Sequence, residues 1–269
     1  MKKILLICVN YNSYDVLQTF LQSVDNAAQK VKEEMKADVA IADNSPEKQP
    51  INNTYSNLSI IDIHKNDNVG YLGGALPLYN QWAQNYDFVS ISNVDLRLKE
   101  DFFANLIGID ITDIGWLAPS ILTQKNNTNE NPFMTHRPQK RNFVIWNIIY
   151  SNTLIHNVYK WLSVKKHQWL AHKQKKTMEQ EQIYAGHGSL MLFTSAFVKQ
   201  NQHLHYPNFM YGEEIYFAEL VRQSRLEVVY HPQLTAYNIG GVSTLKVSHS
   251  IRSQWSKKSV QTLEKMFFL

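Results

Sequence analysis

Apolar and polar residues alternate along the first half of the chain in blocks that predict strands separated by helices. Short apolar runs of the length of buried strands occupy residues 4–9, 39–42, 59–63 and 86–96. After the first run, the apolar residues of 14–31 recur at the spacing of one helix face, and Ser13 precedes them as an N-cap. Strands that alternate with helices predict an α/β fold with a mostly parallel sheet and helices on both faces.

The second half continues this pattern less regularly. Strands are predicted at residues 116–119, 189–193 and 226–230, and helices at residues 143–162 and 215–223. There is no internal repeat and no low-complexity tract. We expect one domain over residues 1–245, divided near residue 120, followed by a basic helical tail over residues 246–269.

Polar residues with ligand-binding side chains follow three of the apolar runs. Residues 10–12 are Asn-Tyr-Asn, residues 43–45 are Asp-Asn-Ser, and residues 93–95 are Asn-Val-Asp. The carboxyl ends of parallel strands share one edge of a sheet, which is where open α/β sheets bind their ligands. Asn and Asp also cap the turns after strands, so each motif alone fits either role. Their recurrence predicts a binding edge where three strand ends converge.

Composition bounds the class of protein. The 269 residues are 44% hydrophobic and 19% charged, which is typical of a globular chain with a substantial core. The single cysteine, Cys8, lies inside the first apolar run and excludes an intramolecular disulfide or a cysteine-based metal site. A reducing cytoplasm is the simplest location. No run approaches the roughly 20 apolar residues of a membrane span. The apolar run at residues 4–9 is not expected to be a signal peptide, because it is short and no small-residue cleavage site follows it.

The net charge of +4 is unevenly distributed. Residues 131–178 contain nine Lys or Arg and no acidic residue, and residues 246–269 contain five basic residues and one acidic residue. A solvated basic surface is one interpretation. The other is a contact with an anionic lipid-diphosphate acceptor at the cytoplasmic membrane face, carried by these basic and aromatic residues: Arg137, Arg141, Trp161, Lys165, Lys166 and Trp169. Nucleic acid ranks last, because no nucleic-acid-binding module accompanies the charge.

A glycine-rich loop follows the third predicted strand. Residues 68–74 are Asn-Val-Gly-Tyr-Leu-Gly-Gly, and glycines allow a backbone to approach phosphates closely. The spacing does not match the dinucleotide-binding pattern G-x-G-x-x-G, which in addition follows the first strand of its fold. A turn before a helix is the alternative interpretation. The position of the loop argues against a dehydrogenase.

Two adjacent carboxylates begin the predicted helix at residues 215–223. Glu213 and Glu214 follow the turn formed by residues 209–212. Acidic residues stabilise helix N-termini, and one carboxylate of a crowded pair can also act as a general base because its pKa is raised. Residues 186–189, Gly-His-Gly-Ser, supply small residues where a substrate could approach the backbone, whereas His187 alone is typical of a structural histidine.

Taken in order, these motifs resemble family 2 glycosyltransferases, in particular the rhamnosyltransferase-like branch that builds bacterial surface polysaccharides. The resemblance covers roughly residues 2–244 and rests on these segments: residues 9–12, 43–45, 68–73, 93–95, 186–189 and 211–214. It implies a GT-A fold, with a nucleotide-sugar half over residues 1–120 and an acceptor half over residues 121–245. It further implies an inverting hexosyltransferase that acts on a saccharide or lipid-linked saccharide.

The resemblance also assigns residues. Those expected to bind the nucleotide sugar are Val9, Asn10, Asn12, Asp43, Asn44, Asn68, Gly70, Gly73, Asn93 and Asp95. Asp95 stands where the family binds Mg²⁺ or Mn²⁺, and Glu214 stands where it has its catalytic base, with Glu213 beside it for acceptor hydroxyls. The chain departs from the family at Asn93, at Glu214 and at Asn238, which replaces a metal-binding histidine and would be a weaker ligand.

The sequence is also compatible with two other functions. Asn238 and the single carboxylate of residues 93–95 leave room for a glycan- or lipid-binding protein that has lost turnover. A nucleotide-dependent oxidoreductase rests only on the glycine loop.

Overall fold

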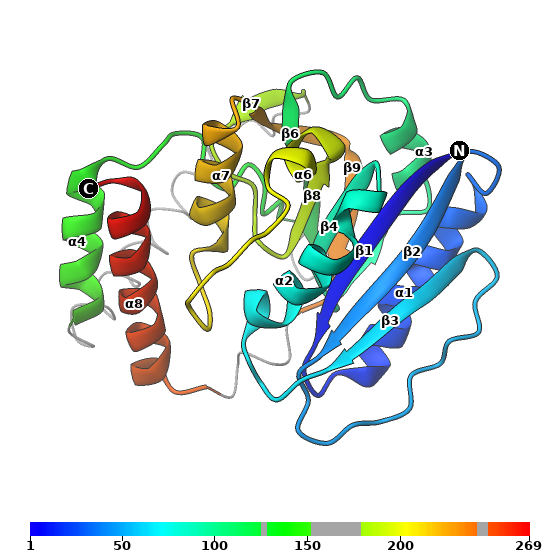
Figure 1. The fold of residues 1–269 in the computed structure, drawn as a ribbon, viewed down its shortest axis with the longest axis horizontal. Helices are drawn as coiled ribbons and strands as arrows, with labels where there is room; N and C mark the ends of the chain where they lie inside the picture. Colours follow the sequence, from blue (N-terminus) through cyan, green and yellow to red (C-terminus); the bar gives the residue numbers. More distant parts are fainter. Residues whose placement is uncertain (125–127, 152–178, 241–246) are drawn as a thin grey trace.

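The computed structural model describes residues 1–124, 128–151, 179–240 and 247–269. Within them, nine strands form one open sheet in the order β3-β2-β1-β4-β8-β6-β9-β5, with β7 paired to β9 (Figure 1). The strands are β1 (Lys2–Asn10), β2 (Met35–Asp43), β3 (Leu58–Lys65), β4 (Phe88–Asn93), β5 (Leu96–Leu98), β6 (Ile114–Thr123), β7 (Glu181–Ile183), β8 (Leu190–Thr194) and β9 (Glu227–Asn238).

The first four strands are parallel. β1 lies between β2 and β4, and β3 lies outside β2. A strand with parallel neighbours on both sides is covered on both faces, which is why residues 4–8 of β1 are all apolar and all buried. The predicted parallel sheet is therefore confirmed for this half of the molecule.

The second half of the sheet is mixed. β8 runs antiparallel to β4 and to β6, β9 runs parallel to β6, and β5 and β7 run antiparallel to β9. The prediction of a mostly parallel sheet is wrong here. A parallel neighbour requires a crossover packed on the sheet. Between β6 and β8, the described helix is α4 (Lys140–Ser151), which packs on α8 (His249–Phe267).

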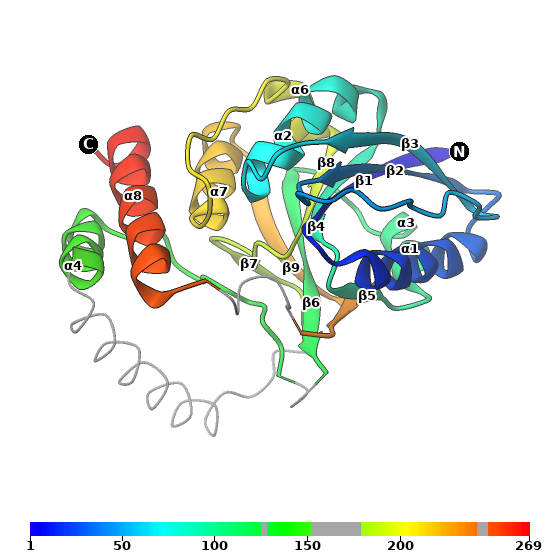
Figure 2. The ribbon, with the colours of Figure 1, turned by 90° about the horizontal axis from the view of Figure 1, so that it is seen from below.

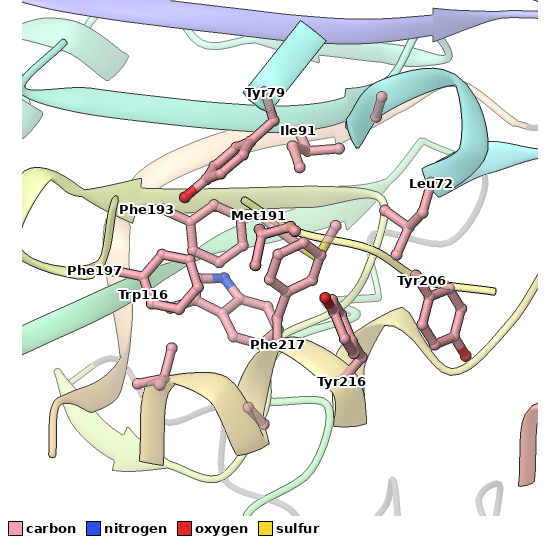
Figure 3. Close-up of a cluster of buried hydrophobic side chains, with 14 of the residues drawn as sticks. Leu72, Tyr79, Ile91, Trp116, Met191, Phe193, Phe197, Tyr206, Tyr216 and Phe217 are labelled. Atoms are coloured by element: carbon pink, nitrogen blue, oxygen red, sulfur yellow. The ribbon is translucent and has the colours of Figure 1, made fainter. Parts of the chain in front are cut away.

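Helices cover both faces of the sheet and define two cores (Figure 2). Helices α1 (Tyr14–Gln29) and α3 (Phe102–Ile107) pack on one face. On the other face lie α2 (Tyr71–Trp82), the 3₁₀ helix η1 (Ala83–Asn85), α6 (Ser195–Gln200) and α7 (Glu213–Gln223). The second core is aromatic: Phe193 of β8 lies 4.6 Å from Phe217 and 5.9 Å from Trp116, between ring centroids (Figure 3).

Several elements differ from the sequence expectation. The helix predicted over residues 143–162 begins at Lys140, and its part beyond Ser151 lies outside the described residues. The short elements α3, α6, β5 and β7 were not predicted, because three to six residues carry little periodicity. Helix α8 forms as predicted, yet it packs against α4 and α7 and is not a separate tail. None of the described helices is long and apolar enough to cross a bilayer.

Candidate active site

The three predicted strand ends do converge. In the parallel register, Asn10 of β1 is paired with Asp43 of β2, and Val9 is paired with Asn93 of β4. The carboxyl ends of these strands therefore form one edge, and the polar residues that follow them meet there. This confirms the expected geometry of the edge.

Asp43 is the centre of a hydrogen-bonded cluster beneath that edge. The side chain is 1% exposed. Its Oδ1 accepts hydrogen bonds from Asn10 Nδ2 at 3.1 Å and from Ser45 Oγ at 2.7 Å, and its Oδ2 accepts one from the Tyr14 hydroxyl at 2.8 Å. The Ser45 hydroxyl also accepts from the backbone N–H of Asn12 at 2.8 Å. The buried side chains of Asp43 and Asn10 thus connect the loop after β1 to the loop after β2.

The glycine loop joins the two halves of the molecule. Gly70 has φ +83°, and a Cβ there would overlap the carbonyl oxygen of Phe209, so only glycine fits. The same oxygen accepts a hydrogen bond from the backbone N–H of Tyr71 at 3.2 Å. Asn44 fixes the loop from the other side, because its Nδ2 donates to the Gly70 carbonyl at 2.8 Å. Gly73 faces Val69 inside α2 and does not line the cavity described next.

A cavity of about 200 Å³ opens at the carboxyl ends of β1, β2 and β4, beside the glycine loop. Six of the predicted nucleotide-binding residues line it directly: Val9, Asn44, Asn68, Gly70, Asn93 and Asp95. The remaining lining comes from residues that the sequence did not assign to the site: Tyr11, Ser13, Val16, Tyr71, Val94, Phe209, Met210, Val247 and Trp255, and from Glu213. The cavity therefore spans both halves of the chain.

The paired carboxylates lie at the start of α7, behind Gly212 in the left-handed conformation with φ +87°. Glu214 Oε1 accepts a hydrogen bond from the Gly188 N–H at 3.3 Å, and the Gly188 carbonyl accepts one from the Tyr71 hydroxyl at 3.0 Å. A Cβ at Gly188 would crowd both glutamate side chains. Burial, and then the charge of Glu214, raises the pKa of Glu213 to about 8.

A second polar cluster surrounds Asp95. Its Oδ1 is buried without a hydrogen-bond partner, and burial, followed by the charge of Glu130, raises the pKa of Asp95, while His187 acts in the opposite direction. Asn238 donates its Nδ2 to Glu130 Oε1 at 3.1 Å and accepts the Gly240 N–H at 2.9 Å. Asp95 fits a ligand of a divalent cation, because an unpartnered carboxylate oxygen is available there.

The other predicted metal ligand fits less well. Asn238 turns its amide hydrogens toward Glu130, and its oxygen already accepts a hydrogen bond. Across the described parts of the chain, no three His, Cys, Asp or Glu side chains are gathered so that they alone could hold a metal ion. A cation bound at Asp95 would therefore take much of its coordination from a ligand.

Helix α8 supplies an aromatic wall that the sequence did not predict. The Trp255 ring lies 4.7 Å from the Phe209 ring, between centroids, and both line the cavity. Ser259 of the same helix donates to the Tyr211 carbonyl at 2.8 Å, next to the Gly212 turn. The only sequence signal for this wall was a tryptophan in a basic helix.

Arg137 forms an ion pair that the sequence did not predict. Its guanidinium binds Glu219, whose carboxylate is fully buried, with Nε to Oε1 at 2.7 Å and Nη2 to Oε2 at 3.1 Å. Glu219 also accepts from the Tyr184 hydroxyl at 2.8 Å. Arg137 therefore neutralises this buried carboxylate, and its predicted contact with an anionic acceptor stays a prediction. The lysines and tryptophans predicted with it, at residues 161–169, lie outside the described residues.

No protein-family model and no curated protein matches the sequence. Solved structures do match. S. aureus TarS residues 1–349 aligns with a TM-score of 0.54 at 10% identity, over 99% of this chain and 72% of that chain. The same TarS segment has been solved with UDP-GlcNAc, and it aligns with a TM-score of 0.53 at 12% identity, over 99% of this chain and 68% of that chain.

GalNAc-T7, solved with UDP, GalNAc and Mn²⁺, aligns with a TM-score of 0.59 at 12% identity, over 94% of this chain and 48% of that chain. This chain therefore spans about half the length of GalNAc-T7. Both neighbours are glycosyltransferases with GT-A-like folds, and the open nine-stranded sheet matches theirs. The predicted GT-A fold is confirmed; at these identities the likeness concerns the fold alone.

Proposed function

We propose that the chain is an inverting glycosyltransferase that moves a sugar from a nucleotide-diphosphate donor to a saccharide or lipid-linked saccharide. The observation that carries the proposal is one cavity lined on one side by strand-end residues and on the other by Glu213 of a paired carboxylate. The neighbours with the same fold support it, because one was solved with UDP-GlcNAc and the other with UDP, GalNAc and Mn²⁺. Rhamnose as the sugar and the cytoplasm as the location remain predictions from the sequence.

The donor is proposed to occupy the strand-end side of the cavity. Tyr11 offers a ring face to the base, and Asn68 and Asn93 offer amide groups to the ribose and the phosphates. Asn10 and Asp43 lie beneath this surface and act by holding its loops. Because the loops are already bonded to one another, the surface is formed before the donor arrives, which reduces the ordering cost of binding.

Glu214 is proposed as the base. Burial, and then the negative charge of Glu214, raises the pKa of Glu213 to about 8, so Glu213 holds a proton near neutral pH. Glu214 then takes the proton of the acceptor hydroxyl while that oxygen bonds to the anomeric carbon, and the bond from this carbon to the diphosphate breaks on the opposite face. Protonated Glu213 can donate a hydrogen bond to a neighbouring acceptor hydroxyl.

A divalent cation, Mg²⁺ or Mn²⁺, would be held by Asp95 together with the donor phosphates. When bound, it neutralises charge that develops on the leaving diphosphate. Asp95 contributes one carboxylate oxygen without a competing hydrogen bond. Asn238 contributes indirectly in this scheme, by holding Glu130 close to Asp95.

The test is to incubate the purified protein with a panel of UDP-, dTDP- and GDP-sugars and to measure nucleotide diphosphate release. Release from one donor that stops in chelator and returns with Mg²⁺ or Mn²⁺ is expected. Full activity in chelator would remove the metal from the scheme. Product configuration, read by NMR at the new glycosidic bond, tests inversion.

One observation favours a second candidate, a glycan- or lipid-binding protein without turnover. Asn238 stands at a position where the resembled family has a metal ligand, and it is engaged with Glu130. Under this alternative, calorimetry would detect binding of a glycan or nucleotide sugar, and no donor in the panel would be consumed. Absence of binding to every nucleotide diphosphate would contradict the proposed transferase.

A further inference from the structure

Helix α4 exposes an unusual outer face. Three aliphatic side chains on it are at least half exposed: Val144 at 55%, Ile145 at 50% and Ile148 at 56%. The other exposed residues of this helix are Lys140, Arg141 and Ser151. At about 100° per residue these six positions fall within an arc of about 140°, so they share one side of the helix. This side, which we call the α4 outer face, is aliphatic and cationic.

Among the described residues, packing does not use this face. The opposite side of α4 contacts α8: the Phe143 ring lies 4.3 Å from the Phe268 ring, between centroids, and the Tyr150 carbonyl accepts from Ser253 Oγ at 3.1 Å. Both views show the α4–α8 pair at the end of the molecule opposite the N-terminus (Figures 1 and 2). Clustered exposed aliphatic residues at such a position indicate an interaction surface.

Basic residues predominate around the face. No acidic residue occurs in α4, and α8 adds Lys257, which lines a groove together with Val144 and Ile148. The acidic residue of this groove, Glu264, accepts a hydrogen bond from Asn147 at 3.1 Å. The partner of this surface must therefore combine negative charge with a region that accepts aliphatic side chains.

We propose that the α4 outer face docks on an anionic lipid bilayer. Aliphatic residues on the exposed side of a helix enter the boundary between headgroups and acyl chains, while the long side chains of Lys140 and Arg141 reach the lipid phosphates. Attraction to anionic headgroups contributes at each cation, and it is screened by salt. Docking is peripheral and reversible, because only three aliphatic side chains enter the lipid.

Two other partners fit the surface less well. A second copy of the chain across a two-fold axis would bring Lys140 and Arg141 against the same cations of its partner. A partner protein would be expected to meet an aromatic anchor, and the α4 outer face has none, since Trp146 packs against Phe143 with ring centroids 5.1 Å apart. A bilayer needs neither directional hydrogen bonds nor an anchor.

The experiment measures co-sedimentation of the full chain with vesicles, without any nucleotide, so its outcome is separate from glycosyl transfer. Vesicles of phosphatidylcholine alone and of phosphatidylcholine mixed with phosphatidylglycerol are compared at low and high salt. The wild type is expected to sediment with the mixed vesicles at low salt and to be released at high salt. Failure to bind mixed vesicles at low salt overturns the proposal.

Variants locate the contact. K140Q/R141Q is expected to lower the partition coefficient by about 25-fold, because each cation near an anionic surface contributes about a factor of five. I145S/I148S is expected to lower it by about tenfold, through lost apolar burial. The matched control is K3Q/K32Q, which removes two exposed lysines, one in β1 and one in the turn before β2. The starts of β1 and β2 pair beside the N-terminus, at the end of the molecule opposite α4. Circular dichroism verifies that each variant is folded.

Three results would contradict the assignment. If K3Q/K32Q loses as much binding as K140Q/R141Q, the attraction is a general property of the net charge. If both α4 variants bind as the wild type does, another surface carries the contact. If sedimentation equilibrium shows a dimer that I145S/I148S abolishes, the α4 outer face joins two copies of the chain.

Discussion

The two sides of the cavity are built in opposite ways. On the strand-end side, the polar groups beneath the cavity satisfy one another, as the bonds among Asn10, Asp43 and Ser45 show, and Asp95 Oδ1 is the exception. On the other side, Glu213 and Glu214 lie together, and the pKa of Glu213 is raised to about 8. Satisfied groups stabilise a shape, whereas crowded charges raise the free energy of the folded state and can be used in proton transfer. The strand-end side is therefore suited to binding the donor, and the side with Glu213 and Glu214 is suited to proton transfer.

The largest effect is expected at the base. Glu214→Gln retains shape and hydrogen bonding but cannot take a proton, so turnover should fall by about 10²–10⁴-fold. Binding of the nucleotide diphosphate should be unchanged, because the Glu214 contact is with Gly188, outside the strand-end side. Nucleotide release kinetics and calorimetry measure the two quantities.

Glu213→Gln is the matched variant for that experiment. It should reduce turnover less, since the amide still donates a hydrogen bond. If Glu213→Gln abolishes turnover and Glu214→Gln does not, the two roles are exchanged. If neither variant loses turnover, the mechanism is wrong.

Crowding of the carboxylates should appear as a pH dependence of stability. The unfolded chain releases the Glu213 proton near the usual pKa of 4.5, and the folded chain keeps it up to about 8. Folding is therefore favoured below pH 4.5, and this contribution is lost as the pH rises to about 8. Relative to Glu213→Gln, the free energy of unfolding should fall by up to a few kcal/mol between pH 5 and 8, given about 1.4 kcal/mol per pKa unit. Urea titrations at several pH values measure it, and a constant difference would contradict it.

On the strand-end side, Asp43→Asn should act on the fold first. An amide nitrogen at the Oδ1 position would face the Asn10 amide donor, and at the Oδ2 position it would remove the acceptor of the Tyr14 hydroxyl, so the free energy of unfolding should fall by about 1–3 kcal/mol. The sequence alone predicted direct nucleotide binding by Asp43. If Asp43→Asn loses nucleotide affinity while its stability is unchanged, that direct contact is supported. Tyr14→Phe removes only one donor to Asp43 and should therefore lower stability less than Asp43→Asn.

The smallest effect is expected at the aromatic wall. Trp255→Ala removes the ring that packs on Phe209 and should raise the KM for the saccharide acceptor by about tenfold, the upper range for an aromatic contact. Donor hydrolysis without acceptor should continue, and Trp255→Phe should retain most of the affinity. An equal loss of donor affinity would place Trp255 on the binding side.

Local patterns in the sequence determined the strand-end side. Strands that alternate with helices predict parallel pairing. Parallel pairing brings Asn10, Asp43 and Asn93 to one edge of the sheet, independently of how the second half of the chain folds. The carboxylate pair was likewise readable, because Gly212 allows the turn that starts α7 at Glu213. These features depend on residues that are close in sequence or on a single repeated unit.

Tertiary structure alone decided the other features. Nothing periodic in the sequence relates Phe209 to Trp255 or Glu130 to Asn238, because these contacts form only when separate elements pack. The ion pair between Arg137 and Glu219 is of the same kind. The sequence shows Arg137 in a basic segment and gives no sign of its acidic partner. Periodicity reports which side of an element is buried, but the partner buried against it depends on how all elements fill the space around one sheet.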